Sequence, residues 1–212
     1  LGERFNANKD NAEVVKMVVY LLTAKECTDT ELYYEGVEAY NKLNPSPDAS
    51  YGLARVYYSK KDKERAMQFF KEATETETNA ENKSRYFQEF GGLILKEGNR
   101  NEAITYLKRA IAAYPRNGKA YLLLGTAYAG VPGCGDDEVS KRSVFWVAVD
   151  QFIKAKQFDI NLADEANKAI NTYSQHFPTQ ADAFMERNIL DGAKYEVKCG
   201  PINEITTVRT KK

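Results

Sequence analysis

The sequence predicts an all-α fold in which antiparallel helix pairs stack into an α-α superhelix (a helical solenoid), followed by a short C-terminal β-hairpin. Alanines frame a large side chain in the same way at three places, Ala66/Phe70/Ala73, Ala103/Leu107/Ala110 and Ala148/Phe152/Ala155. Sets of small and large residues recur at an interval of about 34 residues, a period typical of helical repeat proteins. The end of the chain changes to alternating apolar and polar residues, the pattern of strands.

The clearest repeat signal is the segment Tyr121-Leu-Leu-Leu-Gly125-Thr-Ala-Tyr128. It resembles the W-x2-L-G-x2-Y pattern of the first helix of a tetratricopeptide repeat, with Tyr121 in the place of the tryptophan. The set Phe87/Gly91/Ile94 stands about 34 residues before it, and Leu53/Ala54/Tyr57 stands one repeat earlier, at an interval about three residues longer. Because the two helices of a pair cross closely, a small residue such as Gly125 must lie where the backbones approach. The alternative is an unrelated helical bundle whose alanines happen to align.

The repeat pattern divides the chain into four parts. Residues 1–47 form a degenerate N-terminal helix pair, and residues 48–160 form the repeats, with an insertion at 129–147. Residues 161–188 are expected to be capping helices, and residues 189–212 a β-hairpin tail. Prolines follow the helical runs at Pro45, Pro115 and Pro178, where they stop helix continuation.

The insertion carries an acidic triplet, Asp136-Asp137-Glu138, after a stretch rich in glycine. Acidic residues before a helix favour its dipole and cap its free N–H groups. A divalent-cation site is the alternative, since oxygen ligands suit calcium or magnesium. The triplet lacks the alternating ligands of a calcium loop, so we expect a helix cap. No metal and no cofactor is predicted.

The tail reads as two strands around a turn. Tyr195 to Cys199 alternates apolar and polar residues, Gly200 to Asn203 is a turn signal, and Ile205 to Arg209 is rich in β-branched residues. A two-stranded hairpin is marginal by itself in water, so it must lean on a helix or on another chain. Docking on the helices is expected. The alternative is an open edge that recruits a peptide by strand addition.

Composition excludes several function classes. The chain has 30 basic and 30 acidic residues among 212, without the basic excess of a nucleic-acid-binding protein. Val14 to Leu22 is the best candidate for a membrane span, but it is too short to cross a bilayer and contains Lys16. Lys211–Lys212 is too short for a polybasic membrane anchor. Because the chain begins with Leu1, we expect a processed form or a piece of a longer protein.

The three cysteines, Cys27, Cys134 and Cys199, show none of the close pairs typical of metal sites. Two states are compatible with the sequence: one disulfide with a leftover thiol, or three free thiols.

Several segments resemble a group of tetratricopeptide proteins of Bacteroidetes bacteria. They are Leu22 to Asp29, Pro45 to Pro47, Cys134 to Glu138, Trp146 to Phe152, Ala166 to Tyr173, Phe177–Pro178, Gly192 to Val197 and Gly200 to Arg209. The chain departs from the group's ending because it lacks an aromatic residue near Pro201. The resemblance implies an exported protein without an enzymatic role. The resemblance implies a location in the periplasm or cell envelope. Without it, the expected location is the cytoplasm.

The geometry of tetratricopeptide repeats implies that fixed positions of each first helix line a concave groove. The residues predicted to bind a partner there are Tyr51, Arg55, Tyr58, Arg85, Gln88, Lys119, Leu122 and Thr126. Some relatives clamp the carboxylates of chaperone tails with Lys and Asn, and Tyr51 and Arg55 stand in their place here. That ligand is therefore not expected. The set predicts a groove for a protein or peptide, whose identity and stoichiometry the sequence leaves open.

Catalysis is not predicted. The single histidine, His176, stands before Phe177–Pro178 at the end of a helical run, where it suits a C-terminal cap. The sequence contains no GxSxG, HExxH or glycine-rich phosphate loop. We expect a non-catalytic interaction scaffold; the alternative is a structural spacer that contacts neighbours through its ends and the C-terminal hairpin.

Overall fold

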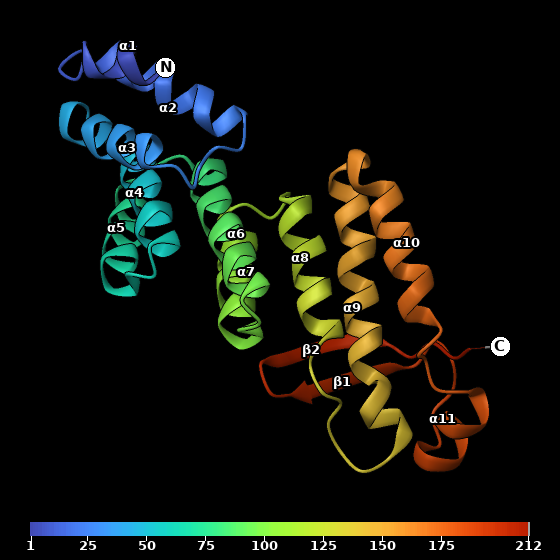
Figure 1. Ribbon diagram of the computed structural model, residues 1–212. Helices are drawn as coiled ribbons and strands as arrows, with labels where there is room; N and C mark the ends of the chain where they lie inside the picture. Colours follow the sequence, from blue (N-terminus) through green and yellow to red (C-terminus); the bar gives the residue numbers. More distant parts are fainter. Residues whose placement is uncertain (212) are drawn as a thin grey trace. The chain divides into compact units, whose positions relative to one another are not determined.

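The computed structural model describes residues 1–211, which form eleven α-helices, one 3-10 helix and two β-strands (Figure 1). The predicted all-α fold of helix pairs with a C-terminal β-hairpin is confirmed. The chain forms two compact units, Leu1–Tyr86 and Phe87–Lys212, which we call the N-terminal unit and the C-terminal unit.

The N-terminal unit is built from short helices joined by tight loops. They are α1 (Gly2–Asn6), α2 (Ala12–Ala24), α3 (Glu31–Leu43), α4 (Pro47–Ser59), α5 (Lys63–Thr76) and the start of α6 (Ala80–Lys96). Side chains cap their N-termini: Thr30 accepts from the Tyr33 N–H, and Ser46 accepts from the Ala49 N–H. Helix α3 ends before Pro45, as that proline predicts.

The core of the N-terminal unit lies between α2, α3 and α4. Val15, Val18 and Leu22 of α2 are buried and lie on one face of the helix. They share one cluster with residues of α3 and α4, among them Tyr33 and Leu53. The opposite face of α2 is therefore free to line a surface.

The C-terminal unit contains the rest of α6 and the following elements: α7 (Arg100–Ala113), α8 (Gly118–Ala129), α9 (Glu138–Phe158), η1 (Ile160–Leu162), α10 (Ala163–Ser174), α11 (Gln180–Arg187), β1 (Lys194–Cys199) and β2 (Ile202–Thr207). Helix α9 is 21 residues long and begins within the segment predicted as an insertion. Its Trp146 is fully buried, and the indole donates a 2.7 Å hydrogen bond to the Arg209 carbonyl.

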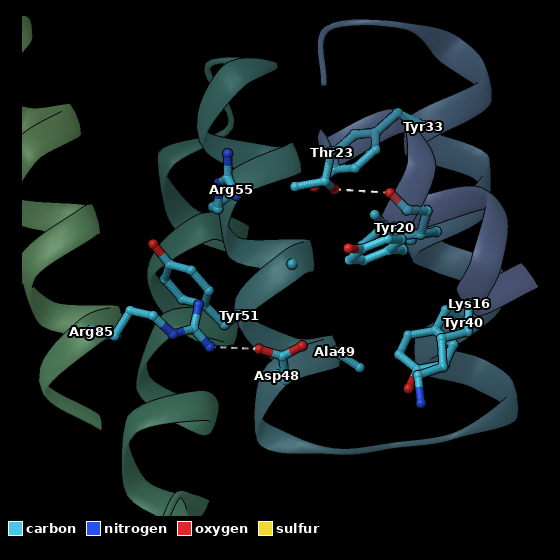
Figure 2. Close-up of a pocket in the computed structure, with 13 residues that line it drawn as sticks. Lys16, Tyr20, Thr23, Tyr33, Tyr40, Asp48, Ala49, Tyr51, Arg55 and Arg85 are labelled. Atoms are coloured by element: carbon cyan, nitrogen blue, oxygen red, sulfur yellow. Dashed lines mark hydrogen bonds and ion pairs between the residues drawn. The ribbon is translucent and has the colours of Figure 1, made fainter. Parts of the chain in front are cut away.

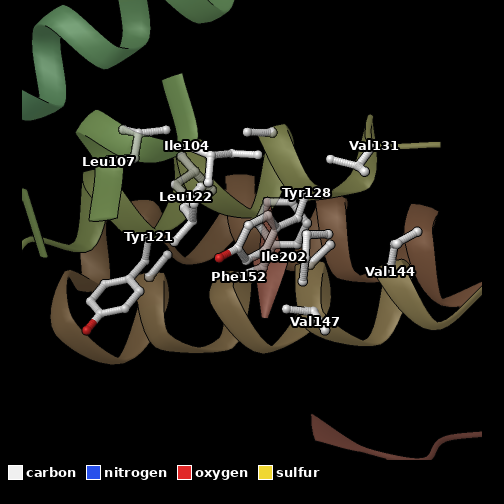
Figure 3. Close-up of a cluster of buried hydrophobic side chains, with 14 of the residues drawn as sticks. Ile104, Leu107, Tyr121, Leu122, Tyr128, Val131, Val144, Val147, Phe152 and Ile202 are labelled. Carbon is white, nitrogen blue, oxygen red and sulfur yellow. The ribbon is translucent and has the colours of Figure 1, made fainter. Parts of the chain in front are cut away.

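Helices α8 and α9 cross at Gly125, as predicted. A Cβ at this position would lie 2.7 Å from Cε1 of Phe152 and 3.0 Å from the Ala148 carbonyl oxygen. Both distances are shorter than van der Waals contact, so only glycine permits this approach. Figure 3 shows Tyr128 and Phe152 in the space beside the crossing.

The hairpin completes the core of the C-terminal unit. Val197, Cys199 and Ile202 belong to the same buried cluster as Leu107 and Phe152 (Figure 3). The Thr206 hydroxyl is 2.5 Å from the Asp150 carboxylate on α9. Docking of the hairpin on the helices, the first of the two sequence-based alternatives, is therefore confirmed.

The strands pair antiparallel from Lys194↔Thr207 to Cys199↔Ile202. The turn is shorter than predicted, because only Gly200 and Pro201 lie between the strands. Ile202, which the sequence assigned to the turn, is the first residue of β2, and its side chain is buried against the helices. Gly200 has φ +55°, the left-handed conformation that glycine adopts without strain.

A disulfide joins Cys134 of the insertion to Cys199 of β1, with their Cα atoms 5.4 Å apart. Cys27 is a free thiol. Of the two states left open by the sequence, the structure has one disulfide and one thiol. The disulfide connects the loop between α8 and α9 to the hairpin across 65 residues of sequence.

Candidate functional site

A pocket of about 230 Å³ opens in the N-terminal unit between α2, α3, α4 and the start of α6. Figure 2 shows its lining. The polar and aromatic groups that line it are Lys16, Tyr20, Thr23, Tyr33, Tyr40, Asp48, Tyr51, Arg55 and Arg85. The small residues Ala49 and Gly52 also line the pocket. The pocket is large enough for one or two side chains of a partner rather than for a folded domain.

Helical spacing brings the lining residues of α4 together. Ser46 caps the helix and Pro47 occupies its first turn, so the following residues are helical from the start. Asp48, Tyr51 and Arg55 are then spaced by three and four residues and lie on one face. Helix α2 repeats this arrangement with Lys16, Tyr20 and Thr23 on the face opposite its buried valines.

One wall of the pocket is held by stacked rings and an ion pair. The rings of Tyr51 and Tyr86 stack with centroids 4.5 Å apart. The Arg85 guanidinium lies 2.9 Å from the Asp48 carboxylate and 4.8 Å from the centroid of the Tyr86 ring. The Tyr86 hydroxyl donates to Glu77 at 3.2 Å. Burial raises the pKa of the Tyr86 phenol, and the Asp48 and Glu77 carboxylates raise it further, so this hydroxyl stays a donor at neutral pH.

Three of the predicted groove residues, Tyr51, Arg55 and Arg85, line this pocket. Tyr51 is only 2% exposed, because its ring is stacked on Tyr86. Tyr58 lies near the C-terminal end of α4, half-buried, and does not line the pocket.

The other four predicted groove residues lie in the C-terminal unit. Gln88 is half-buried on α6. Lys119 lies 3.5 Å from Glu165 of α10. Leu122 is 3% exposed and belongs to the hydrophobic core, so its side chain presents almost no surface to a partner. The Thr126 hydroxyl donates to the Leu122 carbonyl at 3.0 Å.

The sequence-based interpretation missed the residues that α2 and α3 contribute. Lys16, Tyr20, Tyr33 and Tyr40 line the pocket, but they belong to the helix pair taken as degenerate. A signal for α2 was present in the sequence. Lys16 and Tyr20 are four residues apart, on the face away from Val15 and Val18.

The acidic triplet caps a helix, as predicted. Asp137 accepts a 2.9 Å hydrogen bond from the Ser140 N–H at the start of α9. It also forms an ion pair with Arg187 of α11. The Arg187 side chain and the Ser140 N–H hold the pKa of the Asp137 carboxyl well below its ordinary value. No group of three or more His, Cys, Asp or Glu side chains within residues 1–211 has a geometry that suits a metal ion.

The single histidine packs against an aromatic ring. The His176 imidazole stacks on Phe145 with centroids 4.8 Å apart, and its backbone N–H donates to the Tyr173 carbonyl just after α10. It therefore sits at a helix end, as the sequence indicates.

Comparison with known proteins agrees with this architecture. The tetratricopeptide repeat family model matches residues 21–80 and 95–130. The helix pairs of these segments are tetratricopeptide repeats. No curated protein matches the chain. Across residues 1–211, no helix has both the length and the apolar composition needed to span a bilayer.

Solved structures of tetratricopeptide proteins share the fold. MamA is 19% identical, with a TM-score of 0.54, over 76% of this chain and 85% of that chain. YrrB, described as a TPR protein with an unusual peptide-binding site, is 20% identical with a TM-score of 0.50, over 82% of this chain and 81% of its own. PilW, a type IV pilus biogenesis factor, is 16% identical with a TM-score of 0.54, over 86% of this chain and 82% of its own. At these identities the likeness shows the fold alone.

Proposed function

We propose that the chain is a non-catalytic scaffold that binds a peptide or helix of a partner protein on the concave face of its tetratricopeptide repeats. The observation that carries the proposal is the pocket of the N-terminal unit, where aromatic rings and cationic side chains line one opening of about 230 Å³. Aromatic residues and arginine dominate the energetics of protein interfaces. YrrB, a TPR protein with a peptide-binding site, supports the same use of the fold.

Further contacts of the same kind are proposed in the C-terminal unit. Gln88, Lys119 and Thr126 present polar groups to a partner at that unit by itself, whereas the side chain of Leu122 is buried in the core of that unit. Nucleic acid is not a proposed partner, because the chain's 30 basic and 30 acidic residues balance. Insertion into a membrane is not part of the proposal.

We place the protein in the cell envelope or periplasm, and the disulfide between Cys134 and Cys199 supports this location. Disulfides persist in oxidising compartments and are rare in the cytosol. The likeness to PilW, a pilus biogenesis factor, is compatible with the same setting. Thiol labelling of the protein taken directly from its native cells tests the location. Modification of Cys27 alone supports an oxidising compartment, and modification of all three cysteines contradicts it.

Peptide binding is tested with variants of two pocket residues, exposed Tyr20 and half-buried Arg55. Tyr20 is 69% exposed, so Tyr20→Ala combined with Arg55→Ala removes pocket groups with little effect on the core. Tyr51→Ala is a poor test, because the stacked ring is buried and its loss destabilises the unit. Peptides selected from a displayed random library against the wild-type chain serve as probes. We expect the double variant to lose most of their binding.

The matched control is Phe184→Ala combined with Arg116→Ala, which removes an exposed ring and an exposed guanidinium outside the pocket. Control binding should equal that of the wild type, and thermal unfolding should show that all variants fold. If the pocket variant binds the selected peptides as well as the control does, the pocket is not the site and the proposal fails.

A second candidate function, a structural spacer that contacts neighbours through its ends, is favoured by one observation. Phe184, Met185 and Leu190, on α11 and the loop after it, are 56%, 84% and 59% exposed. Exposed apolar side chains in one segment are typical of contact surfaces. Deletion of the hairpin cannot test this function, since its residues belong to the core. Phe184→Ser with Met185→Ser should abolish co-purification of an assembly from native cells, while the pocket variant should preserve it.

A further inference from the structure

The outer edge of β2 carries backbone groups that the hairpin itself does not use. Cys199 and Ile202 flank the two-residue turn, so they form a hydrogen-bonded pair, and every second pair along the strands does the same. Asn203 and Ile205 therefore direct their backbone N–H and C=O groups away from β1. Elsewhere in residues 1–211, no group forms a hydrogen bond with them. Docking on the helices covers one face of the hairpin and leaves this edge open.

The open edge borders a groove of about 340 Å³ between β2 and α9. Helix α9 meets β2 at Asp150, whose carboxylate is 2.5 Å from the Thr206 hydroxyl. Ile153 and Gln157 follow one and two turns further along α9 and line the groove beside the edge. Figure 1 shows α9 crossing the hairpin and running on past β2. The groove shares no residue with the pocket of the N-terminal unit.

Two apolar side chains beside the edge are exposed. Ile205 is 72% exposed and lies opposite Glu196 on the face of the hairpin that points away from the helices, and Ile153 is 40% exposed on α9. The side chains of a strand point alternately to its two faces. A third strand beside β2 would therefore place one set of side chains next to Ile205 and the other set on α9 next to Ile153. It would gain apolar contacts on both faces in addition to its backbone hydrogen bonds.

The groove also has an excess of positive charge. The two carboxylates in its lining are each paired with a cation, at 2.5 and 3.2 Å. Lys154 and Lys194 line the same groove and form no ion pair with any residue from 1 to 211. The Lys154 ammonium lies 5.7 Å from the centroid of the Tyr121 ring, and the Lys194 ammonium lies 3.3 Å from the Thr207 hydroxyl. An acidic side chain in an added strand would supply the missing counter-charge.

We propose that the outer edge of β2 binds an extended, acidic segment of a partner protein by strand addition. The segment forms a third strand, hydrogen-bonded to the backbones of Asn203 and Ile205. It carries an apolar side chain next to Ile205 and, on its other face, an acidic side chain toward Lys154. This second binding surface does not depend on the pocket of the N-terminal unit.

The charge of the groove favours a partner segment over a second copy of this chain. Pairing of two β2 edges would bring together the Lys154 and Lys194 side chains of both copies. The positive charge at the edge would then be doubled instead of neutralised, and like charges repel.

The test uses peptides of about ten residues from a displayed random library. They are selected against the full chain carrying Tyr20→Ala and Arg55→Ala, so that binding in the pocket of the N-terminal unit is not enriched. Binding of fluorescein-labelled peptides to the wild-type chain is then measured by anisotropy. N-methylation of the peptide backbone, one residue at a time, should weaken binding about tenfold at every second residue and little at the residues between. This alternation is expected because only every second N–H of an added strand points toward β2.

Proline variants connect the binding to one edge of the hairpin. Ile205→Pro removes an N–H that points away from β1, a position where an edge strand tolerates proline, and should weaken binding about tenfold. Glu196→Pro is the matched control, because it removes the corresponding N–H from the opposite edge and should leave binding unchanged. Thermal unfolding checks that both variants fold, and the N-methylation series remains decisive if one does not.

A charge variant tests the acidic character of the segment. Peptides with Asn or Gln in place of their acidic residues should bind about threefold more weakly to the wild type. Lys154→Gln should remove this difference. Lys168→Gln, which changes an exposed lysine of α10 outside the groove, should preserve it.

The contrary outcomes separate this proposal from the pocket. Failure to select any peptide, an N-methylation series without alternation, or equal losses in the two proline variants would overturn strand addition and leave the function of the pocket untouched. Equal binding of acidic and amide peptides would overturn the acidic character of the segment. A concentration-dependent dimer of the wild type that Ile205→Pro abolishes would assign the edge to a second copy of the chain instead.

Discussion

The Tyr128 hydroxyl on α8 donates a 2.8 Å hydrogen bond to the Glu204 carboxylate on β2. Glu204 also lies 3.2 Å from the Lys108 ammonium on α7. Tyr128 occupies an aromatic core position of the repeat, and its hydroxyl also contacts the C-terminal hairpin directly. Burial raises the pKa of the Tyr128 phenol and the Glu204 carboxylate raises it further, so the hydroxyl remains protonated and donating.

Removing this hydroxyl should weaken the C-terminal unit moderately. Tyr128→Phe keeps the ring and loses the hydrogen bond, and Glu204 keeps its ion pair with Lys108. We expect a loss of about 1 kcal/mol in the free energy of unfolding. Trp146 is the single tryptophan and is buried in this unit, so its fluorescence in a urea titration reports the change. Tyr114→Phe is the control, because no hydrogen bond of its hydroxyl occurs within residues 1–211; an equal loss in both would contradict the argument.

The helix crossing at Gly125 should not tolerate a methyl group. Gly125→Ala places a Cβ 2.7 Å from the Phe152 ring and 3.0 Å from a backbone oxygen. Overpacking of this kind costs about 1–3 kcal/mol of stability. Gly92→Ala is the matched control, because its Cβ would meet Leu123 at an ordinary 3.4 Å. Alanine favours the helix over glycine, so the control should be neutral or stabilising in the same urea titration.

Loss of the disulfide should destabilise the C-terminal unit. Cys134 and Cys199 are 65 residues apart, and a cross-link over such a loop contributes about 2–4 kcal/mol. Replacing both with serine, or reducing the wild type, should lower the urea midpoint followed by Trp146 fluorescence. Cys27→Ser serves as the control, since this thiol is free. Identical midpoints for the oxidised and reduced protein would show that the cross-link has no stabilising role.

Acid should weaken the start of α9 through Asp137. Its pKa is lowered in the folded state by Arg187, so the unfolded chain takes up a proton at higher pH than the folded chain. The stability from this carboxylate is complete above its ordinary pKa of about 4 and is lost as the pH falls below it. Asp137→Asn retains a residue that caps helices. Its unfolding temperature should therefore change less between about pH 5 and pH 2 than that of the wild type.

The control for this pH series is Asp136→Asn. Asp136 is exposed, and its carboxylate forms no ion pair in the part of the chain from 1 to 211. It should reproduce the wild-type pH dependence. If the unfolding temperature of Asp137→Asn depends on pH as strongly as that of the wild type, the acid sensitivity comes from other carboxylates.

Local patterns predicted much of the fold. The small residue at Gly125 and the large residues at Tyr128 and Phe152 indicate a close helix crossing, because those sizes are required by the local geometry. Alternation from Tyr195 to Cys199 indicates a strand, since side chains point to opposite faces along it. Each of these signals is contained within a few neighbouring residues or one repeat.

The candidate site was predicted only in part. Tyr51, Arg55 and Arg85 line the pocket, because their positions in the repeat determine the face on which they lie. Buried Leu122 shows the limit of position alone, since its exposure depends on the side chains packed around it.

Sequence patterns were enough to predict paired helices with close crossings and a terminal hairpin, because helical and strand periodicities are local properties of neighbouring residues. Three relationships are visible only in the folded chain: Cys134 pairs with Cys199, the hairpin completes the core, and Lys16 and Arg55 line the same pocket. These relationships join residues far apart in the chain. They depend on how whole elements pack, and no local spacing contains that information.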